Sequence, residues 1–341
     1  MSGTAMKKRI LIIYTGGTIG MQRSECGYVP VSDFRQLLHE QLKTEAAKQL
    51  PDFQIAEFGQ LIDSANLRPD DWTLMGRLIE GNWSDYHGFI LLHGTDTLAY
   101  TASALSFMFQ GVDKPIIVTG SQIPLAELRN DAMENLLTAL IIEDQYDVPG
   151  VSVYFNGRLL RGNRSVKMKC NSFDAFDSPN FPWLGKVGIN IRIDQKLLLF
   201  SETLKICVPE FMADSVVVIP VYPGISTRVF AAVLENSKVQ GLILQSYGVG
   251  NAPDNDSLFI AALQKAINRG VAILNITQCP YGAVDQHAYA TGNTFNRLGV
   301  IAGSDLTLEA AFTKMHFLLA CGFKGSELSN KLNQPLCGEC E

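Results

Sequence analysis

Two short hydroxyl-rich segments carry side chains that could do chemistry. Thr15–Thr18 reads Thr-Gly-Gly-Thr and His93–Thr97 reads His-Gly-Thr-Asp-Thr, and each directly follows an apolar run. Because open α/β sheets bind ligands at the carboxyl ends of their parallel strands, we expect the two segments to lie close together. Thr18 in the first segment, with Thr95 and Asp96 in the second, predicts a hydroxyl nucleophile with polar activation.

Each segment also has a structural interpretation. Gly16 and Gly17 permit a sharp strand-to-helix turn capped by Thr18, and Asp96 by itself would most often cap a helix. A nucleotide cradle is a further alternative, but the first segment has neither G-x-G-x-x-G spacing nor the Lys-Ser/Thr ending of a phosphate loop. Asp33, the next candidate acidic residue, opens a helix-like stretch instead of ending a second strand. The occurrence of both segments in one sequence favours a catalytic role over a purely structural one.

A threonine hydroxyl needs a neighbouring base, because it is a weak nucleophile at neutral pH. Of the five histidines, only His93 lies in one of the two segments, and its place at a buried strand end predicts a structural hydrogen-bonding role. The sequence lacks H-E-x-x-H and paired Cys/His zinc spacing, so we expect neither a metal nor a cofactor. The base is therefore expected among lysine, tyrosine and carboxylate side chains.

Apolar runs that alternate with helical patterning indicate βαβ units. The pattern predicts an α/β protein with larger N-terminal and smaller C-terminal α/β domains, each with a mostly parallel sheet flanked by helices. The expected strands are Ile10–Tyr14, Phe89–Leu92, Ile116–Thr119, Val151–Phe155, Val216–Ile219, Gly241–Gln245 and Val271–Ile276, and the expected helices are Ala99–Phe109, Asp131–Ile142, Ala261–Asn268 and Leu308–Ala320.

The length of the chain also favours two domains. Its 341 residues exceed the size at which one hydrophobic core usually stops growing. The stretch from about 176 to 213 contains several prolines and little clear periodicity, which is typical of a boundary. We predict an N-terminal catalytic domain over 1–190, a linker over 191–213 and a C-terminal domain over 214–341.

The charge and hydropathy exclude two classes of partner. A net charge of −6 and a pI near 5.5 oppose attraction to nucleic-acid phosphates and to anionic lipid, so we expect neither nucleic acid nor membrane. The basic N-terminal residues precede an apolar run that is too short for a secretory signal. No apolar run approaches the roughly 20 residues of a membrane span. These features predict a cytoplasmic protein.

The cysteines predict reduced thiols. There are seven, an odd number without the density of a disulfide scaffold. Cys337 and Cys340 have C-x-x-C spacing but lie beside the end of the sequence, where a redox or zinc site would lack supporting structure. We therefore expect no such site there.

Longer segments around the two hydroxyl motifs resemble the signatures of the L-asparaginase family, and three others resemble its bacterial cytoplasmic (type I) branch. The resemblance extends from about Lys8 to Leu319. The two signature segments are Ile12–Gly20 and Gly88–Leu98, and the three branch segments are Thr119–Leu125, Arg161–Arg164 and Ser246–Pro253.

The resemblance implies an amidohydrolase that converts L-asparagine to L-aspartate and ammonia. Thr18 matches the nucleophile that would carry a covalent acyl intermediate. Thr95, Asp96 and Lys167 match a second polar triad, which could pass protons between its members. Tyr28 matches the tyrosine of a flexible lid.

The family also implies how substrate and subunits are arranged. Asp63 and Ser64 match positions that hold the α-amino and α-carboxylate groups of the substrate, with Asp96 helping at the ammonium. Closure of the lid over 20–30 would exclude water until ammonia has left. Asn251 matches a residue contributed by a neighbouring subunit, which implies a homodimer or a homotetramer.

Some cytoplasmic members of the family bind a second asparagine at an activating site between subunits. Thr277 and Cys279 match this site, but Gln245 and Val166 stand where those members have arginine and threonine. Loss of the guanidinium removes the bidentate partner for an α-carboxylate. We therefore predict that activation by asparagine is weak, altered or absent.

Other functions remain as alternatives. Relatives that act on L-glutamine or on amidated tRNA would keep the same motifs, although the acidic charge disfavours the RNA substrate. A non-catalytic amino-acid-binding protein would keep the fold. It would leave unexplained why Thr18, Thr95, Asp96 and Lys167 are all present.

Overall fold

The computed structural model describes residues 7–25, 27–31, 33–43, 49–200, 203–288 and 290–341. These residues form two compact units. The first unit runs to Ser178 and includes Pro182–Val208, and the second comprises Pro179–Phe181 and Pro209–Glu341. Cys26, which belongs to the predicted lid and to the set of expected thiols, lies outside the described residues.

The first unit contains an eight-stranded sheet in the order β13-β12-β9-β8-β7-β5-β1-β4. Its β4, β1, β5, β7 and β8 strands are parallel, and its β9, β12 and β13 strands extend it in antiparallel pairs. The bounds of these strands are β1 Arg9–Tyr14, β4 Asp52–Glu57, β5 Gly88–Leu92, β7 Pro115–Thr119, β8 Gly150–Phe155, β9 Arg158–Arg161, β12 Gly185–Val187 and β13 Ile191–Ile193.

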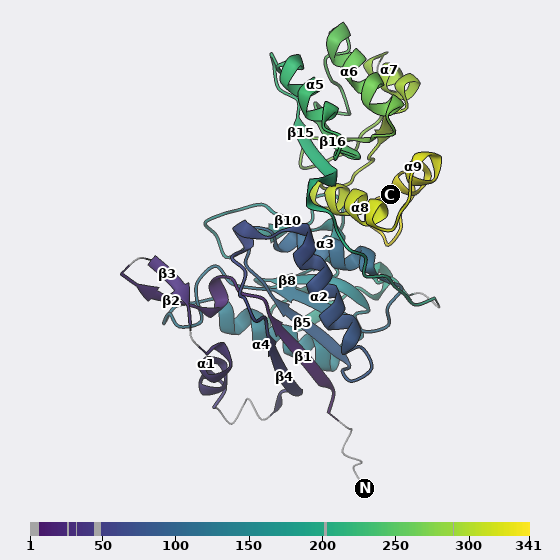
Figure 1. Cartoon of the computed structure of the whole chain (residues 1–341). Helices are drawn as coiled ribbons and strands as arrows, with labels where there is room; N and C mark the ends of the chain where they lie inside the picture. The colour runs from purple at the N-terminus through teal and green to yellow at the C-terminus, as the bar shows by residue number, and fades with distance from the viewer. Residues whose placement is uncertain (1–6, 26, 32, 44–48, 201–202, 289) are drawn as a thin grey trace. The chain divides into compact units, whose positions relative to one another are not determined.

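Helices cover both faces of this sheet. The α2 and α3 helices lie on one face and α4 on the other (Figure 1). The central strands β5 and β7 are fully buried, which explains why they read as continuous apolar runs without alternation. The helices of this unit are α1 Phe34–Gln41, α2 Pro69–Gly81, α3 Leu98–Met108 and α4 Ala132–Gln145, with short 3₁₀ turns η1 Thr18–Gly20, η3 Ser64–Asn66, η4 Gly162–Arg164 and η5 Gln195–Leu197.

Three small two-stranded sheets complete the first unit. A hairpin follows η1, and its strands pair Arg23 with Tyr28. A second pair brings Lys167 opposite Phe176. The strands are β2 Met21–Ser24 with β3 Gly27–Pro30, β10 Val166–Lys167 with β11 Phe176–Asp177, and β6 Phe109–Gln110 with β14 Lys205–Ile206.

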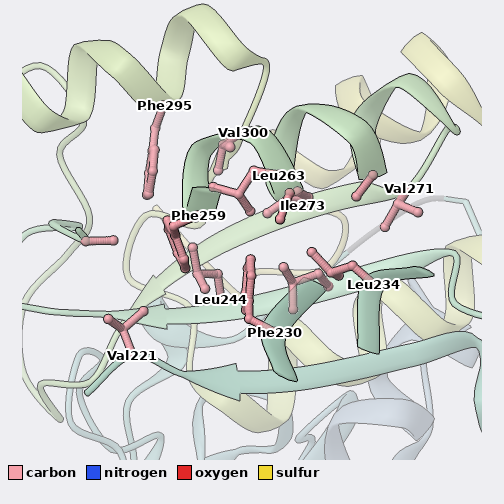
Figure 2. Close-up of a cluster of buried hydrophobic side chains, with 14 of the residues drawn as sticks. Val221, Phe230, Leu234, Leu244, Phe259, Leu263, Val271, Ile273, Phe295 and Val300 are labelled. Carbon is pink, nitrogen blue, oxygen red and sulfur yellow. The ribbon is translucent and has the colours of Figure 1, made fainter. Parts of the chain in front are cut away.

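The second unit contains a parallel four-stranded sheet in the order β15-β16-β17-β18. The α5 and α6 helices pack on one face of this sheet, where the rings of Phe230 and Phe259 stack with centroids 4.5 Å apart (Figure 2). The α8 helix packs against the same strands, with Met315 against Gly241. The bounds are β15 Val216–Pro220, β16 Gly241–Ser246, β17 Ala272–Thr277, β18 Ile301–Ala302, η6 Ala213–Ser215, α5 Thr227–Glu235, α6 Ser257–Asn268, α7 Ala290–Leu298, α8 Leu308–Ala320 and α9 Gly325–Leu332.

This architecture confirms the predicted fold class of two α/β units with mostly parallel sheets. It also places residues that the sequence assigns to a linker. Residues 191–208 belong to the first unit, because β13 pairs with β12 and β14 pairs with β6. Among the residues placed by the structure, none of the helices has the length and apolar character that a bilayer crossing needs.

Candidate active site

Thr18 is presented by a glycine turn at the carboxyl end of β1. Gly16 and Gly17 adopt φ angles of 124° and 85°, which side-chain-bearing residues rarely adopt. The turn is held by the backbone of Thr15, whose N–H donates to Leu92 O at 3.1 Å and whose carbonyl accepts from Ile62 N at 2.7 Å. Thr18 then begins the η1 turn, where it is half-buried.

The second hydroxyl motif lies against this turn. A Cβ atom on Gly17 would lie 2.4 Å from the Cα of Gly94, so the two backbones touch in the absence of side chains. Because Thr18 follows Gly17 and Thr95 follows Gly94, this contact holds the two threonines at neighbouring strand ends. The expectation that the two segments lie close together is confirmed.

Replacing Gly17 with alanine is expected to lower kcat by about 10²-fold or more, because the new methyl group must displace the Gly94 backbone and with it Thr95. The positive φ adds a strain of about 1–2 kcal/mol. Gly150→Ala is the matched control, since Gly150 has a φ of 92° and no atom within 4 Å of an added Cβ. Measuring kcat and the melting temperature of both variants separates the effect of the steric contact with Gly94 from the effect of backbone strain at positive φ. Equal losses of kcat in the two variants would contradict the role assigned to the contact.

Lys167 joins Thr95 and Asp96 into one polar network. Its Nζ atom donates to Thr95 Oγ1 at 2.8 Å and to Asp96 Oδ1 at 2.7 Å. The Lys167 side chain is 18% exposed and that of Asp96 is 60% exposed. Thr95 is buried, so the network runs from solvent at the carboxylate to a shielded hydroxyl. Such a chain can carry a proton between the amine and the hydroxyl.

Gln122 completes the network and has no role predicted from the sequence. The Thr95 hydroxyl donates to its Oε1 atom at 3.3 Å. Its Nε2 atom donates to the carbonyls of Cys170 at 3.3 Å and Ser172 at 3.0 Å, in the loop after Lys167. Gln122 thus orients the hydroxyl that Lys167 contacts. Its place in the polar segment after the third expected strand was the available signal.

The expected substrate-binding residues lie on the η3 turn beside the glycine contact. Asp63 caps this turn by accepting from Ala65 N at 3.1 Å. Ser64 is buried, and a Cβ on Gly94 would lie 2.4 Å from its Oγ atom. The Ser64 carbonyl accepts from Thr97 Oγ1 at 2.8 Å, which ties η3 to the second motif.

Tyr28 lies on the β2–β3 hairpin that follows Thr18. The residue is 45% exposed, and its hydroxyl donates to Glu127 Oε1 at 3.2 Å. Glu127 belongs to the loop after β7, the strand that Gln122 also follows. The hairpin is therefore tethered to the loop that supports the polar network.

His93 has the structural role that the sequence predicts. Its Nδ1 lies 2.7 Å from Gly94 O, and its Nε2 lies 2.9 Å from the hydroxyl of Thr101. Trp72 Nε1 donates to Thr101 at 3.1 Å, so Thr101 can donate to the ring and Nδ1–H to the carbonyl. Burial lowers the pKa of His93 to about 4, against a small opposing effect of the Gly94 carbonyl. The neutral imidazole ring therefore has a structural role, linking Gly94 to Thr101.

Burial of His93 is expected to make unfolding stability depend on pH. Its pKa is about 4 folded and about 6.5 unfolded, so its stabilising contribution is complete above pH 6.5 and is lost as pH falls toward 4. Between these limits the slope attributable to one group approaches about 1.4 kcal/mol per pH unit. Buried Glu143 and Glu309 have raised pKa values and act in the opposite direction, since the folded state retains their protons.

The test is therefore a difference between two proteins. Denaturant unfolding from pH 7 to pH 4.5 should show a stability advantage of wild type over His93→Gln that shrinks as the pH falls. A pH-independent difference would contradict the burial of a neutral ring at this position.

The remaining candidate residues belong to the second unit. Asn251 closes a turn in which Tyr247 N donates to Asn251 O and Asn251 N to Tyr247 O, both at 2.8 Å. Gln245 is the next-to-last residue of β16, and Thr277 is the last residue of the neighbouring strand β17. Thr277 Oγ1 accepts from Cys279 N at 3.0 Å. The three expected effector residues therefore share one edge of one sheet.

Comparison with known proteins decides the family. The family model described as "Asparaginase, N-terminal" matches residues 9–199, and "Glutaminase/Asparaginase C-terminal domain" matches residues 215–331. The chain belongs to the asparaginase family. L-asparaginase 1 of Escherichia coli K12 is 46% identical over 333 residues, which cover 98% of each chain.

Solved structures of asparaginases share the fold of the whole chain. The structure of L-asparaginase I from Vibrio cholerae has a TM-score of 0.89 at 43% identity and covers 98% of this chain and 99% of that one. The thermostable L-asparaginase from Thermococcus kodakarensis has a TM-score of 0.87 at 30% identity with the same coverage. The asparaginase fold thus accounts for both units.

Proposed function

We propose that this asparaginase-family chain hydrolyses L-asparagine to L-aspartate and ammonia through a β-aspartyl ester on Thr18. The observation that carries the proposal is the contact of Lys167 Nζ with Thr95 and Asp96 beside the Thr18 turn. A hydroxyl at a strand end, next to a relay that can move its proton, is the arrangement that acyl transfer needs.

The first half-reaction forms the ester. Thr18 Oγ1 attacks the side-chain amide carbon, and its proton passes through Thr95 and Lys167 to the amide nitrogen, which leaves as ammonia. Backbone N–H groups of the glycine turns would stabilise the oxyanion; one such donor is typically worth about 10²–10³-fold in rate. The second half-reaction uses the same relay in reverse, because water then attacks the ester and Thr18 regains its proton.

The charged groups around the turn match the ends of the substrate. Asp63 and Asp96 offer carboxylates for the α-ammonium, and Ser64 offers a hydroxyl for the α-carboxylate. The Tyr28 hairpin would act as the lid that excludes water while ammonia leaves. Asn251 would complete the site from a neighbouring subunit, in a homodimer or homotetramer. A cytoplasmic location stays a prediction.

Ammonia release over a titration with L-asparagine, and separately with L-glutamine, tests the substrate. We expect asparagine to be preferred, as the names of the similar enzymes from Escherichia coli and Vibrio cholerae suggest. Tight asparagine binding without turnover would contradict the proposal and favour a binding protein.

The same titration tests the effector site. Gln245 cannot offer a bidentate guanidinium to an α-carboxylate, so we expect a hyperbolic rate curve. Gln245→Arg restores that group on the edge shared with Thr277 and is the matched variant. A strongly sigmoidal curve for the wild-type enzyme would contradict the loss of activation.

A further inference from the structure

The segment 336–341, which follows α9, is folded around a buried carboxylate and is called the Glu339 strap below. The carboxylate of Glu339 is completely buried. It accepts from Leu336 N at 2.9 and 3.0 Å and from Cys337 N at 2.9 Å. The expectation that the motif of Cys337 and Cys340 lacks supporting structure is therefore wrong.

A buried ion pair anchors the Glu339 strap to α8. Lys314 Nζ lies 2.7 Å from Glu339 Oε1, and both side chains are 0% exposed. Lys314 also donates to the carbonyls of Leu332 at 3.2 Å and Gln334 at 2.7 Å. An ion pair whose remaining polar atoms are hydrogen-bonded in this way holds one geometry, and removing either partner would leave a buried charge.

The Glu339 strap holds the loop that follows β18. Glu341 N donates to Asp305 Oδ1 at 3.0 Å, and Ser304 Oγ donates to Glu341 O at 3.3 Å. Ser304 adopts a φ of 48°, which residues with side chains seldom adopt, so neighbouring contacts have to stabilise it. The strap supplies two such contacts, one to Ser304 and one to the residue after it.

This loop supports the turn of Asn251 through a buried asparagine of β17. Gly303 N donates to Asn275 O at 2.8 Å, and Asn275 Nδ2 donates to Gly250 O at 3.0 Å. Asn275 is 0% exposed. Its backbone therefore contacts the loop after β18, and its side chain contacts the residue directly before Asn251.

A second route from the same loop reaches the turn through buried Val284. Val284 N donates to Ser304 O at 2.8 Å. A Cβ atom on Gly250 would lie 2.8 Å from Val284 Cγ1, so this side chain packs directly on the turn. The next residue, Asp285, donates its N–H to Val249 O at 2.9 Å. The turn is thus supported from two directions.

The turn itself needs such support. Gly248 and Gly250 have φ angles of 50° and 115°, and two glycines give a short turn more conformational freedom than other residues would. The contacts with Asn275 and Val284 restrict that freedom at Gly250. They therefore also limit where Asn251 can lie.

We propose that the Glu339 strap positions Asn251 for the active site of a neighbouring subunit, with Asn275 and Asp305 as positioning residues. The inference rests on the proposed contribution of Asn251 to that site. The strap holds the loop after β18, and this loop holds the Asn251 turn. Because a displacement of about 1 Å in a substrate-positioning group can cost about 10²-fold in rate, loss of this support is expected to reduce turnover.

Single variants give the first test. Asn275→Ala and Asp305→Ala are expected to lower kcat/KM for L-asparagine at least about tenfold, because each removes one link between the strap and the turn. Asp305→Asn keeps a side-chain oxygen that can accept from Glu341 N, so it should retain most of the activity. Near-normal kcat/KM in both alanine variants, or equal losses in Asp305→Ala and Asp305→Asn, would overturn the proposal.

Thr313→Ala is the matched control for the loss of a buried polar group. The Thr313 hydroxyl donates to Glu309 O at 2.7 Å within α8 and is fully buried. Its removal should lower the melting temperature without changing kcat/KM. A loss of kcat/KM equal to that of Asn275→Ala would show that general destabilisation explains both results and would overturn the proposal.

Mixed oligomers separate positioning from misfolding. An Asn275→Ala chain and a Thr18→Ala chain are co-expressed with different affinity tags, and oligomers that carry both tags are isolated. In such a hybrid, the intact Thr18 of one chain meets the intact Asn251 turn of the other. Because each hybrid pair has one complete site in two, we expect about a quarter to a half of wild-type kcat, well above either parent.

Two further hybrids complete the test. Asn251→Ala replaces Asn275→Ala as the positive control, and Asp305→Ala replaces it if the Asn275→Ala chain does not assemble. Activity equal to the mean of the parents, with restoration by Asn251→Ala, would overturn the proposal. Failure of Asn251→Ala to restore activity would overturn it as well, because Asn251 would then not act on a neighbouring site.

Failure of the proposed function is distinguishable from failure of this inference. It would show as asparagine hydrolysis by Thr18→Ala oligomers before any mixing. The comparison of kcat/KM among Asn275→Ala, Thr313→Ala and the two Asp305 variants would still test the role of the strap.

Discussion

Replacing Thr18 with alanine is expected to lower kcat for L-asparagine at least about 10³-fold, because no ester can form without the hydroxyl. The turn that presents Thr18 is held by backbone contacts of Thr15, Gly16 and Gly17, so the variant should fold normally. Substrate affinity should change little, since the proposed charged contacts lie on η3 and at Asp96. Steady-state ammonia release and calorimetric binding measure the two quantities.

Thr18→Ser is the matched control for this experiment. It retains a hydroxyl at the same backbone position and should retain most of the activity that alanine removes. If alanine and serine reduce kcat equally, the loss reflects packing in the η1 turn, and the nucleophile is another group. Near-normal turnover by the alanine variant would favour direct attack by water activated at Thr95.

Replacing Lys167 with methionine is expected to lower kcat about 10²–10⁴-fold, the usual range for loss of a positioned proton-transfer group. Methionine is unbranched like lysine and one atom shorter, so it can preserve the packing of the side-chain stem, which is 18% exposed in Lys167. It removes the donor to Thr95 and the counter-ion of Asp96 together. Asp96 is also a proposed contact for the substrate ammonium, so we expect KM to change as well, but by a smaller factor than kcat.

Lys169→Met is the matched control, since it removes a lysine from the same loop. Lys169 is 48% exposed and pairs with Asp174, away from Thr95 and Asp96. It should leave kcat within about twofold of wild type, as surface ion pairs contribute little. Equal losses in the two variants would show that the loop as a whole, and not the Lys167 amine, supports turnover.

The sequence predicts those parts of the fold where pattern and environment agree. The β5 and β7 strands are buried on both faces, and their apolar runs mark them within one residue of their observed ends. The α8 helix matches its predicted range because Thr307 caps its start by accepting from Ala310 N. In each of these elements, burial or helix capping requires particular residue types at particular positions, so the element can be located from the sequence.

Other elements leave no such signal. The β12 and β13 strands are three residues each and half-exposed, so neither length nor alternation separates them from a loop. Their pairing with β9 depends on the neighbouring chain. The sequence therefore ends the N-terminal domain at residue 190 and assigns β13 to the linker, although β13 pairs with β12 and extends the large sheet.

The residues of the candidate active site likewise divide into those that the sequence pattern predicts and those that it does not. The glycine turns and the hydroxyls at the ends of β1 and β5 follow from strand order alone. The assignment of Lys167 required the family resemblance, because Lys167 lies 71 residues from Asp96 on a two-residue strand. Gln122 was missed because its role depends on two carbonyls, those of Cys170 and Ser172, that only the folded loop brings to it.

The covalent step is the central claim, and a rapid acid quench tests it most directly. Wild-type enzyme is mixed with saturating L-asparagine, quenched in acid within the first turnover and digested for peptide mass mapping. The account predicts an aspartyl group on the peptide that contains Thr18, with its appearance accompanied by release of ammonia. First-turnover release of ammonia with an unmodified Thr18 peptide, or an aspartyl group on Thr95 instead, would contradict it.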